Sequence, residues 1–344
     1  MDVLNRDWIG VLPNVLITAG SRRVPLVNAF GRALAKLGTG RVVVIDVNPL
    51  SPAVYSAERA YRVPMASDPH YIDDVMAIAV GEDVGVVIPT IDDELTVFAN
   101  ARDRFAAADV RVMVSPCTTT ELCNDKLATC RELRRLGIAA AESYLPPDIP
   151  QSPAFPLFIK PRYGRGGVGA FAIQNERELA FFLDYVPDPV VQEFLEGPEF
   201  TIDMLCDFGG RPLSIVPRER VVIRAGVIDR GRTVKDTRLI ELAMACAAKM
   251  RFVGPINIQC RIVGDRPVIF EINPRFSGGI PLTIEAGADF PLMILQLAAG
   301  CRVKPAIGCF RDNLWMTNYE ASVFIDGASV RLEPFMPGAV TKDV

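Results

Sequence analysis

The sequence contains a single histidine, His70, among 344 residues. Zinc sites built on several histidines, such as the H-E-x-x-H hydrolases, are therefore excluded. A Ser-His-Asp triad would have to use His70, but no nucleophile-elbow motif is present in the chain. Any catalysis is expected to rest on lysine, arginine, carboxylate and amide side chains together with a cofactor.

Cysteine pairs, excess charge and long apolar runs are also missing. The eight cysteines include no C-x-x-C pair, which favours reduced thiols over zinc ligands or a disulfide framework. A net charge of −4 argues against a general nucleic-acid binder. No apolar run approaches the roughly 18 residues of a membrane span, and residues 1–7 lack the features of a secretory signal. These absences predict a cytoplasmic protein that binds neither nucleic acid nor membranes.

At 344 residues the chain is long enough for two or three domains with substantial cores, and half of its residues are hydrophobic, as in globular proteins. In the first 115 residues, short apolar runs alternate with amphipathic segments, which predicts a doubly wound α/β domain. Its expected strands are residues 14–20, 41–46, 85–89 and 110–115. Ligands of such sheets bind beyond the carboxyl ends of the strands, here residues 19–23 and 90–94. Asp92 and Asp93 are either substrate contacts or helix caps.

No G-x-G-x-x-G motif follows the first strand, so Asp46 at the end of the second strand is weak support for an NAD site. A different phosphate-binding signal comes later. A strand over residues 155–161 carries Lys160 and leads into residues 162–169, which include four glycines. Glycines let backbone N–H groups approach an anion closely. This loop predicts a triphosphate site, although a simple turn would have the same composition.

Residues 255–275 form a predicted β-hairpin with one apolar and one polar face. A three-residue turn over 264–266 would pair Cys260 with Phe270 and would set Gln259 beside Glu271. The second strand would then divide into two faces, with Ile269 on the same face as Glu271. Carboxylate and amide oxygens are ligands that suit Mg²⁺. The polar face is either a metal site or a solvated surface.

Two further stretches carry charge. Residues 190–203 are expected to form a strand, a tight connection and a second strand, in which Glu199 could contact ribose hydroxyls. Between Arg211 and Arg238 the basic residues outnumber the acids, which suggests recognition of phosphate or carboxylate, or else a solvated ribbon. Residues 315–325 read as a strand, either at a sheet edge or at an interface.

In this order, the motifs resemble the ATP-grasp superfamily, and within it the branch of the carbamoyl-phosphate synthetase large subunit. The resemblance spans about residues 14 to 300. The motifs that carry it are Asn124-Asp125-Lys126, Phe158-Ile159-Lys160-Pro161 with its glycine-rich loop, Gln192 to Glu199, Asn257-Ile258-Gln259 and Glu271-Ile272-Asn273-Pro274-Arg275.

The resemblance implies a mixed α/β and α+β architecture. A Rossmann-like domain (1–115) would precede a small α+β lid subdomain (116–188) and a larger antiparallel α+β subdomain with a tail (189–344). The chain is about one ATP-grasp unit long, whereas the synthetase large subunits contain two such units. Nothing in the sequence provides the second active site.

The resemblance also implies roles for individual residues, with ATP and Mg²⁺ (or Mn²⁺) as cofactors. The residues expected at the nucleotide are Lys126, Lys160, Gly166, Gly167, Glu193, Leu195 and Glu199. The expected metal ligands are Gln259, Glu271 and Asn273, and the expected catalytic residues are Arg275, Lys160 and Arg224. Arg224 belongs to a segment where relatives place substrate-facing loops.

The implied activity is ATP-dependent ligation of a small carboxylate to an amine or a thiol through an acylphosphate, with release of ADP and phosphate. Two alternatives stay open: a kinase-like or carbamate-phosphorylating enzyme, and a non-catalytic nucleotide-binding regulator. A homodimer is compatible with each of them.

Overall fold

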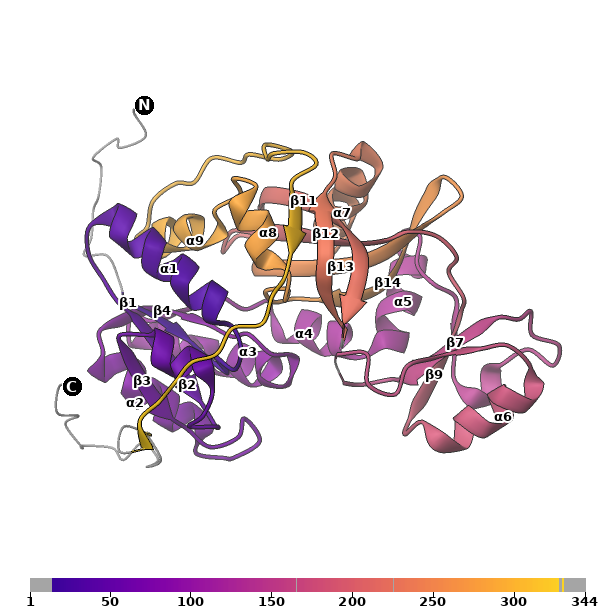
Figure 1. Cartoon of the computed structure of the whole chain (residues 1–344), viewed down its shortest axis with the longest axis horizontal. Coiled ribbons are helices and arrows are strands. Elements are labelled where there is room, and N and C mark those ends of the chain that lie inside the picture. Colours follow the sequence, from indigo (N-terminus) through magenta and orange to yellow (C-terminus); the bar gives the residue numbers. More distant parts are fainter. Residues whose placement is uncertain (1–13, 165, 225, 328–329, 331–344) are drawn as a thin grey trace. The chain divides into compact units, whose positions relative to one another are not determined.

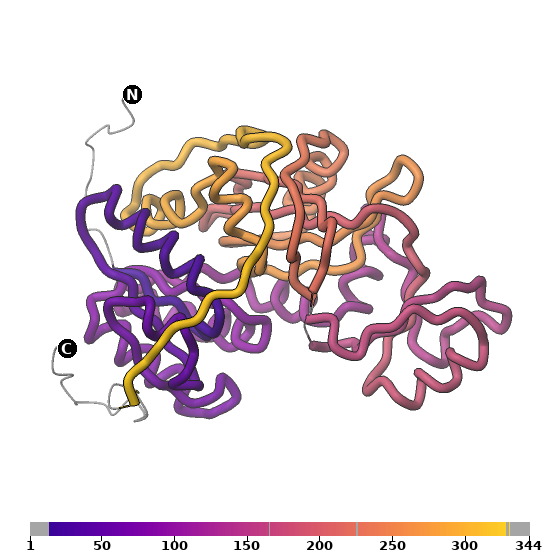
Figure 2. Tube along the Cα trace, in the orientation of Figure 1, coloured from indigo at the N-terminus to yellow at the C-terminus, as the bar shows by residue number. Residues whose placement is uncertain are grey.

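The computed structural model describes residues 14–164, 166–224, 226–327 and 330. Two compact units divide the chain. The first contains residues up to Val114, together with 289–304 and the segment from Tyr319, and the second contains 115–288 and 305–318. In the chain trace of Figure 2, residues up to Val114 of the first unit are indigo to purple, and most of the second unit is magenta to orange.

The first unit is built on a parallel sheet of five strands in the order β3-β2-β1-β4-β5, with helices along it (Figure 1). Its strands are β1 (Asn14–Ile17), β2 (Val42–Asp46), β3 (Arg59–Arg62), β4 (Val84–Ile88) and β5 (Arg111–Val112). Its helices are α1 (Val24–Leu37), α2 (Tyr71–Gly81), α3 (Asp92–Ala107), α9 (Phe290–Ala298) and the short η1 (Pro52–Ser56). This is the strand order of a Rossmann fold without its sixth strand, and the parallel sheet agrees with the predicted doubly wound α/β domain.

Two details of the first unit go beyond the sequence analysis. The strand β3 was not predicted, because its residues are mostly polar and only Ala60 is buried. Helix α9 packs in the first unit although it lies late in the chain, and Lys36 of α1 pairs with Asp289 at 2.7 Å. The division into residues 1–115, 116–188 and 189–344 stays a prediction.

The second unit contains two antiparallel sheets. The smaller has the order β6-β9-β7-β8, with β6 (Ser143–Tyr144), β7 (Leu157–Pro161), β8 (Phe171–Ile173) and β9 (Pro189–Glu193). The larger has the order β14-β13-β10-β11-β12-β15, with β10 (Glu199–Cys206), β11 (Pro212–Arg224), β12 (Val227–Thr233), β13 (Gly254–Val263), β14 (Arg266–Asn273) and β15 (Trp315–Thr317). The helices are α4 (Cys117–Asn124), α5 (Lys126–Arg135), α6 (Glu176–Tyr185), α7 (Thr237–Lys249), α8 (Ile280–Glu285) and the short η2 (Pro146–Asp148).

The turn of the β13–β14 hairpin differs from the prediction. Val263 pairs directly with Arg266, so the turn has two residues, Gly264 and Asp265, and not three. Gly264 adopts a φ of 60°, which is the left-handed conformation that short hairpin turns require. A glycine at this position makes the tighter turn accessible.

A β-bulge compensates for the shorter turn. Cys260 pairs with Ile269, so the predicted partner Phe270 is wrong, and the register shifts between Gln259 and Cys260. Beyond the bulge Gln259 pairs with Glu271, as predicted. The extra residue in β14 also turns Ile269 into the apolar core, where it is completely buried. The sequence placed Ile269 on the polar face, and this was wrong for the same reason.

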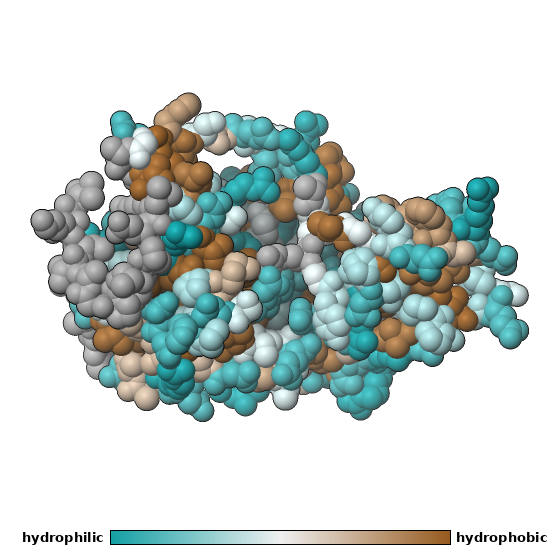
Figure 3. Space-filling model, turned by 90° about the horizontal axis from the view of Figure 1, so that it is seen from below, coloured by the Kyte–Doolittle hydropathy of each residue, from teal (hydrophilic) through white to brown (hydrophobic). Residues whose placement is uncertain are grey.

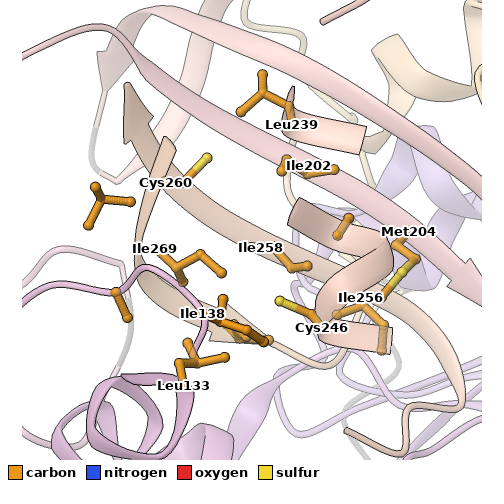
Figure 4. Packing of buried hydrophobic residues seen from close by; sticks show 14 of the residues in the cluster. Leu133, Ile138, Ile202, Met204, Leu239, Cys246, Ile256, Ile258, Cys260 and Ile269 are labelled. Carbon is orange, nitrogen blue, oxygen red and sulfur yellow. The ribbon is translucent and has the colours of Figure 1, made fainter. Parts of the chain in front are cut away.

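The core of the second unit lies between the apolar face of the large sheet and the helices that cover it. Figure 4 shows Ile202 and Met204 of β10, Ile256 and Ile258 of β13, and Cys246 of α7 converging in this space. These side chains alternate along β10 and β13, and each is completely buried or nearly so. Burial of such a set stabilises the sheet by about 1.5–3 kcal/mol for each large aliphatic side chain. The opposite face of the same strands is left for polar groups.

Among the described residues, no helix is both long and apolar enough to span a membrane. On the face drawn in Figure 3, hydrophilic and hydrophobic side chains are intermixed, and no belt of apolar residues is visible.

Candidate active site

The residues that the resemblance implies all lie in the second unit, whose large sheet forms the floor of the site, whereas Asp92 and Asp93 lie in the first turn of α3 in the first unit. Residues paired directly across antiparallel strands point to the same face. Glu271, Gln259, Thr201 and Arg218 follow one another across β14, β13, β10 and β11. The neighbouring row holds Asn273, Asn257 and Asp203. The polar face predicted for two strands therefore extends over four.

Three of the predicted residues form a hydrogen-bonded chain at the end of β14. The Asn273 amide donates to the Glu271 carboxylate at 3.0 Å, and its carbonyl oxygen accepts from the Arg275 guanidinium at 3.2 Å. Arg275 also donates to the backbone oxygen of Phe276 at 3.1 Å. The side chains at positions 271, 273 and 275 are thus oriented by one another.

The donor set fits a divalent cation. Glu271 supplies a carboxylate, and Gln259 and Asn273 supply amide oxygens, the hard ligands that Mg²⁺ prefers. On the same face, the Oδ1 atom of Asn257 is buried and accepts no hydrogen bond within the described part of the chain. The described residues contain no cluster of three His, Cys, Asp or Glu side chains suited to a metal. A metal at this site would therefore be bound by the Glu271 carboxylate and by amide oxygens.

Glu199, the predicted ribose contact, is held by two arginines. One carboxylate oxygen accepts from Arg220 at 2.6 Å, and the other accepts from Arg261 at 2.7 Å. Its side chain is only 11% exposed. These contacts fix the carboxylate at the start of β10.

Lys160 connects the small sheet to the large one. It lies on β7, is buried, and donates to the backbone oxygen of Phe270 at 3.2 Å, with its ammonium 5.4 Å from the centre of the Phe270 ring. Burial lowers the pKa of Lys160, while the nearby Glu271 carboxylate opposes that shift. The β-bulge at Phe270 is therefore also a contact point for the predicted phosphate-binding lysine.

Lys126 begins helix α5 and contacts the glycine-rich loop, because its ammonium donates to the Gly164 carbonyl at 2.6 Å. The preceding Asp125 caps α5 through the Ala128 amide and accepts from Arg162 at 2.6 Å. Burial opposes ionisation of Asp125, but hydrogen bonds from Arg162 and Ala128 outweigh it and lower the pKa of this carboxyl.

Gly166 and Gly167 lie in the loop between β7 and β8, with φ values of 73° and 68°. Residues with side chains rarely adopt this conformation, so glycine gives the loop its path. The Cα atom of Gly226, in the turn between β11 and β12, lies 3.7 Å from a Cβ built on Gly167. The glycine-rich loop and this turn are thus in contact.

The other predicted nucleotide residues occupy the connection between β9 and β10. Glu193 ends β9, and its carboxylate accepts from the backbone amide of Glu142 at 2.9 Å. Leu195 is 8% exposed and belongs to the hydrophobic core of the unit. Arg224 lies at the exposed end of β11, where it pairs with Val227 across the hairpin.

The polar face also contains a buried ion pair that the sequence did not reveal. Arg218 donates to Asp203 at 2.7 and 3.1 Å, and the two side chains are 1% and 2% exposed. Arg218 also donates to Ser277, and Thr283 donates to Asp203 at 2.5 Å. The alternation of Glu199, Thr201 and Asp203 on one strand was a signal that could have shown this face to be polar.

The predicted basic excess between Arg211 and Arg238 is largely compensated inside the unit. Arg218, Arg220, Arg232 and Arg238 each pair with an acid at 2.6–2.7 Å. The acids are Asp203, Glu199, Glu219 and Asp236. Most of this segment therefore stabilises the sheet and the start of α7.

Two known families match different parts of the chain. The family described as "ATP-grasp in the biosynthetic pathway with Ter operon" matches residues 185–320, and the "PylC-like, N-terminal domain" matches residues 15–113. The first match includes the polar face, and the second covers most of the parallel sheet.

The curated relatives include large chains of carbamoyl phosphate synthase. The chain is 26% identical to that of Thermus thermophilus over 295 residues, which cover 76% of this chain and 27% of the relative. It is 24% identical over 285 residues to the arginine-specific large chain of Bacillus subtilis, with the same coverage. The chain thus spans about a quarter of the length of these relatives.

Solved structures share the fold. The biotin carboxylase domain of Hydrogenobacter thermophilus 2-oxoglutarate carboxylase, in complex with MgADP, has a TM-score of 0.68 at 16% identity, covering 89% of this chain and 74% of that one. N5-carboxyaminoimidazole synthetase from Staphylococcus aureus, complexed with ADP, has a TM-score of 0.68 at 16% identity, covering 88% and 81%. The L-amino acid ligase of Bacillus licheniformis has a TM-score of 0.65 at 21% identity, covering 87% and 77%.

The matched families, the relatives and the shared architecture agree with the order of motifs in the sequence. Residues 185–320 match an ATP-grasp family, the chain has the ATP-grasp fold, and its sequence resembles the large chain of carbamoyl phosphate synthase.

Proposed function

We propose that this protein is an ATP-dependent ligase that joins a small carboxylate to an amine or a thiol through an acylphosphate. The hydrogen-bonded chain from Glu271 through Asn273 to Arg275, with Gln259 beside it, is the observation that carries the proposal. It combines metal-type ligands with an arginine, the two kinds of group that phosphoryl transfer requires. Solved structures of this fold include a biotin carboxylase domain with MgADP, N5-carboxyaminoimidazole synthetase with ADP, and an L-amino acid ligase.

ATP would be held by residues from both sheets of the second unit. Lys126 and Lys160 would offset the charge of the phosphates, and the backbone N–H groups of Gly166 and Gly167 would cover them. The connection with Glu193 and Leu195 would contact adenine. Glu199 would accept a hydrogen bond from ribose while its two arginines keep it in place.

Gln259, Glu271 and Asn273 would hold Mg²⁺ or Mn²⁺, which would offset the charge of the phosphates. Arg275 would stabilise the phosphoryl group during transfer, and Arg224 would contact the substrate carboxylate. An oxygen of that carboxylate attacks the γ-phosphorus, and the bond to ADP breaks. The amine or thiol then attacks the carbonyl carbon, loses its proton and displaces phosphate.

A second candidate is phosphorylation of a carbamate, which the similarity to carbamoyl phosphate synthase favours. The two candidates differ in what the amine does. A ligase releases phosphate only when both a carboxylate and a nucleophile are present. A carbamate-phosphorylating enzyme would release ADP with bicarbonate and ammonia or with carbamate alone.

The test is a matrix of carboxylates and amines, including amino acids, read by ADP release. With a substrate that turns over, hydroxylamine is expected to trap a hydroxamate, and formation of AMP would contradict an acylphosphate route. Arg275→Met is expected to lose ADP release. Arg266→Met, at the exposed opposite end of the same strand, is the matched control and should retain it.

The cytoplasmic location and the homodimer stay predictions. Light scattering of the purified chain measures the second.

A further inference from the structure

The side chain of Arg220 joins parts of the site that belong to different strands. One guanidinium nitrogen donates to Glu199 at 2.6 Å and to the Oε1 atom of Gln259 at 3.2 Å. The other terminal nitrogen donates to the backbone oxygen of Gly226 at 2.7 Å. One side chain thus contacts the proposed ribose residue, a proposed metal ligand and the turn between β11 and β12.

Arg220 is buried where it makes these contacts, since its side chain is 6% exposed. Burial lowers the pKa of Arg220, and the Glu199 carboxylate opposes that shift. A guanidinium has five donors in a rigid fork, so it can hold several acceptors in one fixed arrangement. Lysine has a single charged nitrogen on a flexible chain and cannot span the same three acceptors.

The turn that Arg220 holds is in contact with the glycine-rich loop. A Cβ atom on Gly226 would lie 2.4 Å from the backbone oxygen of Gly166, so the two backbones approach as closely as glycine allows. Gly226 has a φ of 73°, which also favours glycine. The contacts therefore run from Gln259 through Arg220 and Gly226 to Gly166.

The hydrogen bond to Gln259 leaves its amide oxygen able to bind a metal. An amide oxygen has two lone pairs, and Arg220 uses one of them. Groups that hydrogen-bond a metal ligand fix its orientation, and removing them typically costs about 10–100-fold in metal affinity or activity. The charge of Arg220 would repel a cation, but Glu199 offsets it at 2.6 Å.

We propose that Arg220 is a positioning residue that orients Gln259 for the metal and couples this ligand, through Gly226, to the glycine-rich loop over the phosphates. This proposal rests on the proposed function, which supplies the metal and the phosphates. In this role Arg220 would act through Gln259 and Gly226 and not by binding the metal itself.

Arg261 is a matched control, because it holds the other oxygen of the same Glu199 carboxylate at 2.7 Å. Arg261 also donates to the backbone oxygen of Gly197 at 3.2 Å, in the connection between β9 and β10. Arg220→Gln and Arg261→Gln each remove one arginine from Glu199. Only the first also releases Gln259 and Gly226.

The experiment measures two quantities in the full chain. Mn²⁺ affinity at saturating ADP is measured from free Mn²⁺ by electron paramagnetic resonance, and amide hydrogen exchange is followed in peptides of the glycine-rich loop. Arg220→Gln is expected to weaken Mn²⁺ binding about tenfold. It is also expected to speed exchange in the loop, because the turn that contacts the loop loses the hydrogen bond from Arg220 to Gly226. Arg261→Gln should leave both within about twofold, although it weakens ADP binding. Arg220→Lys should show the same changes as Arg220→Gln, and it is measured instead if the glutamine variant does not fold.

Unchanged or tighter Mn²⁺ binding in Arg220→Gln would overturn the proposal, since the guanidinium would then act only as a competing charge. Equal effects of the Arg220 and Arg261 variants would overturn it as well, by assigning the whole effect to Glu199. Failure of the wild-type chain to bind MnADP would contradict the proposed function instead. Hydrogen exchange in the loop would still decide whether Arg220 acts through Gly226.

Discussion

Replacing Asp203 with asparagine is expected to destabilise the second unit far more than the same change of acid to amide at Glu219. Both acids accept a hydrogen bond from an arginine at 2.7 Å. They differ in burial, because the Arg218 and Asp203 side chains are 1% and 2% exposed, while Arg232 and Glu219 are 38% and 22% exposed.

The expected magnitudes follow from this difference in burial. Asp203→Asn leaves the Arg218 charge buried without a counter-charge, which typically costs about 3–5 kcal/mol. It also weakens the bond from Thr283. Glu219→Gln changes a pair that water already reaches, and such pairs contribute about 0–1 kcal/mol. For a unit of this size, about 1 kcal/mol corresponds to roughly 2–4 °C in the melting temperature.

Differential scanning calorimetry of the two variants is the assay. We expect the melting transition of the second unit to fall by about 6–20 °C for Asp203→Asn and by at most about 4 °C for Glu219→Gln. The double variant Arg218→Met with Asp203→Leu should recover part of the loss, because an apolar pair leaves no buried charge. Equal melting temperatures for the two single variants would refute the reasoning, as would a double variant less stable than Asp203→Asn.

Three further expectations concern the site. Lys160→Met should lower MgATP affinity at least about tenfold in calorimetric titration without lowering the melting temperature, because burial already disfavours the lysine charge; a large loss of stability would contradict this. Asp125→Ala removes the α5 cap and should cost about 1–2 kcal/mol in urea unfolding at neutral pH. The lowered pKa of Asp125 means that the wild type loses this contribution as the pH falls below about 4, so the two proteins should converge in acid. Gly226→Ala should speed hydrogen exchange in the glycine-rich loop, because its Cβ would lie 2.4 Å from the Gly166 oxygen; exchange at the wild-type rate would show that the contact is dispensable.

The sequence predicted the strand pairing correctly at one end of the β13–β14 hairpin and incorrectly at the other. Alternation of polar and apolar residues set Gln259 against Glu271, because a one-residue slip would have placed apolar side chains on the wrong face. The same rule could not choose the turn. A two-residue turn with a bulge at Phe270 satisfies the polar end equally well, and only packing of Ile269 into the core distinguishes the two solutions.

For the arginines between Arg211 and Arg238, the sequence likewise showed one feature, the excess of basic residues, and left the acid partners undetermined. Local composition revealed a basic segment, and it was compatible with a ligand site or a solvated surface. The acids that pair with Arg218 and Arg220 lie 15 and 21 residues away, on the neighbouring strand. Strand pairing brings them together, and no local pattern encodes which acid faces which base.

By itself the sequence determined the parallel sheet in the first 115 residues and the strand that carries Lys160 into its glycine-rich loop. It also determined the polar face with Gln259, Glu271 and Asn273. These features depend on short-range alternation, glycine conformation and spacing along one strand. Only the tertiary structure decided the bulge, the ion pairs on the polar face, and the placement of α9 in the first unit. Each of those depends on contacts between residues far apart in the chain, whose free energy is set by burial and charge pairing that local sequence does not specify.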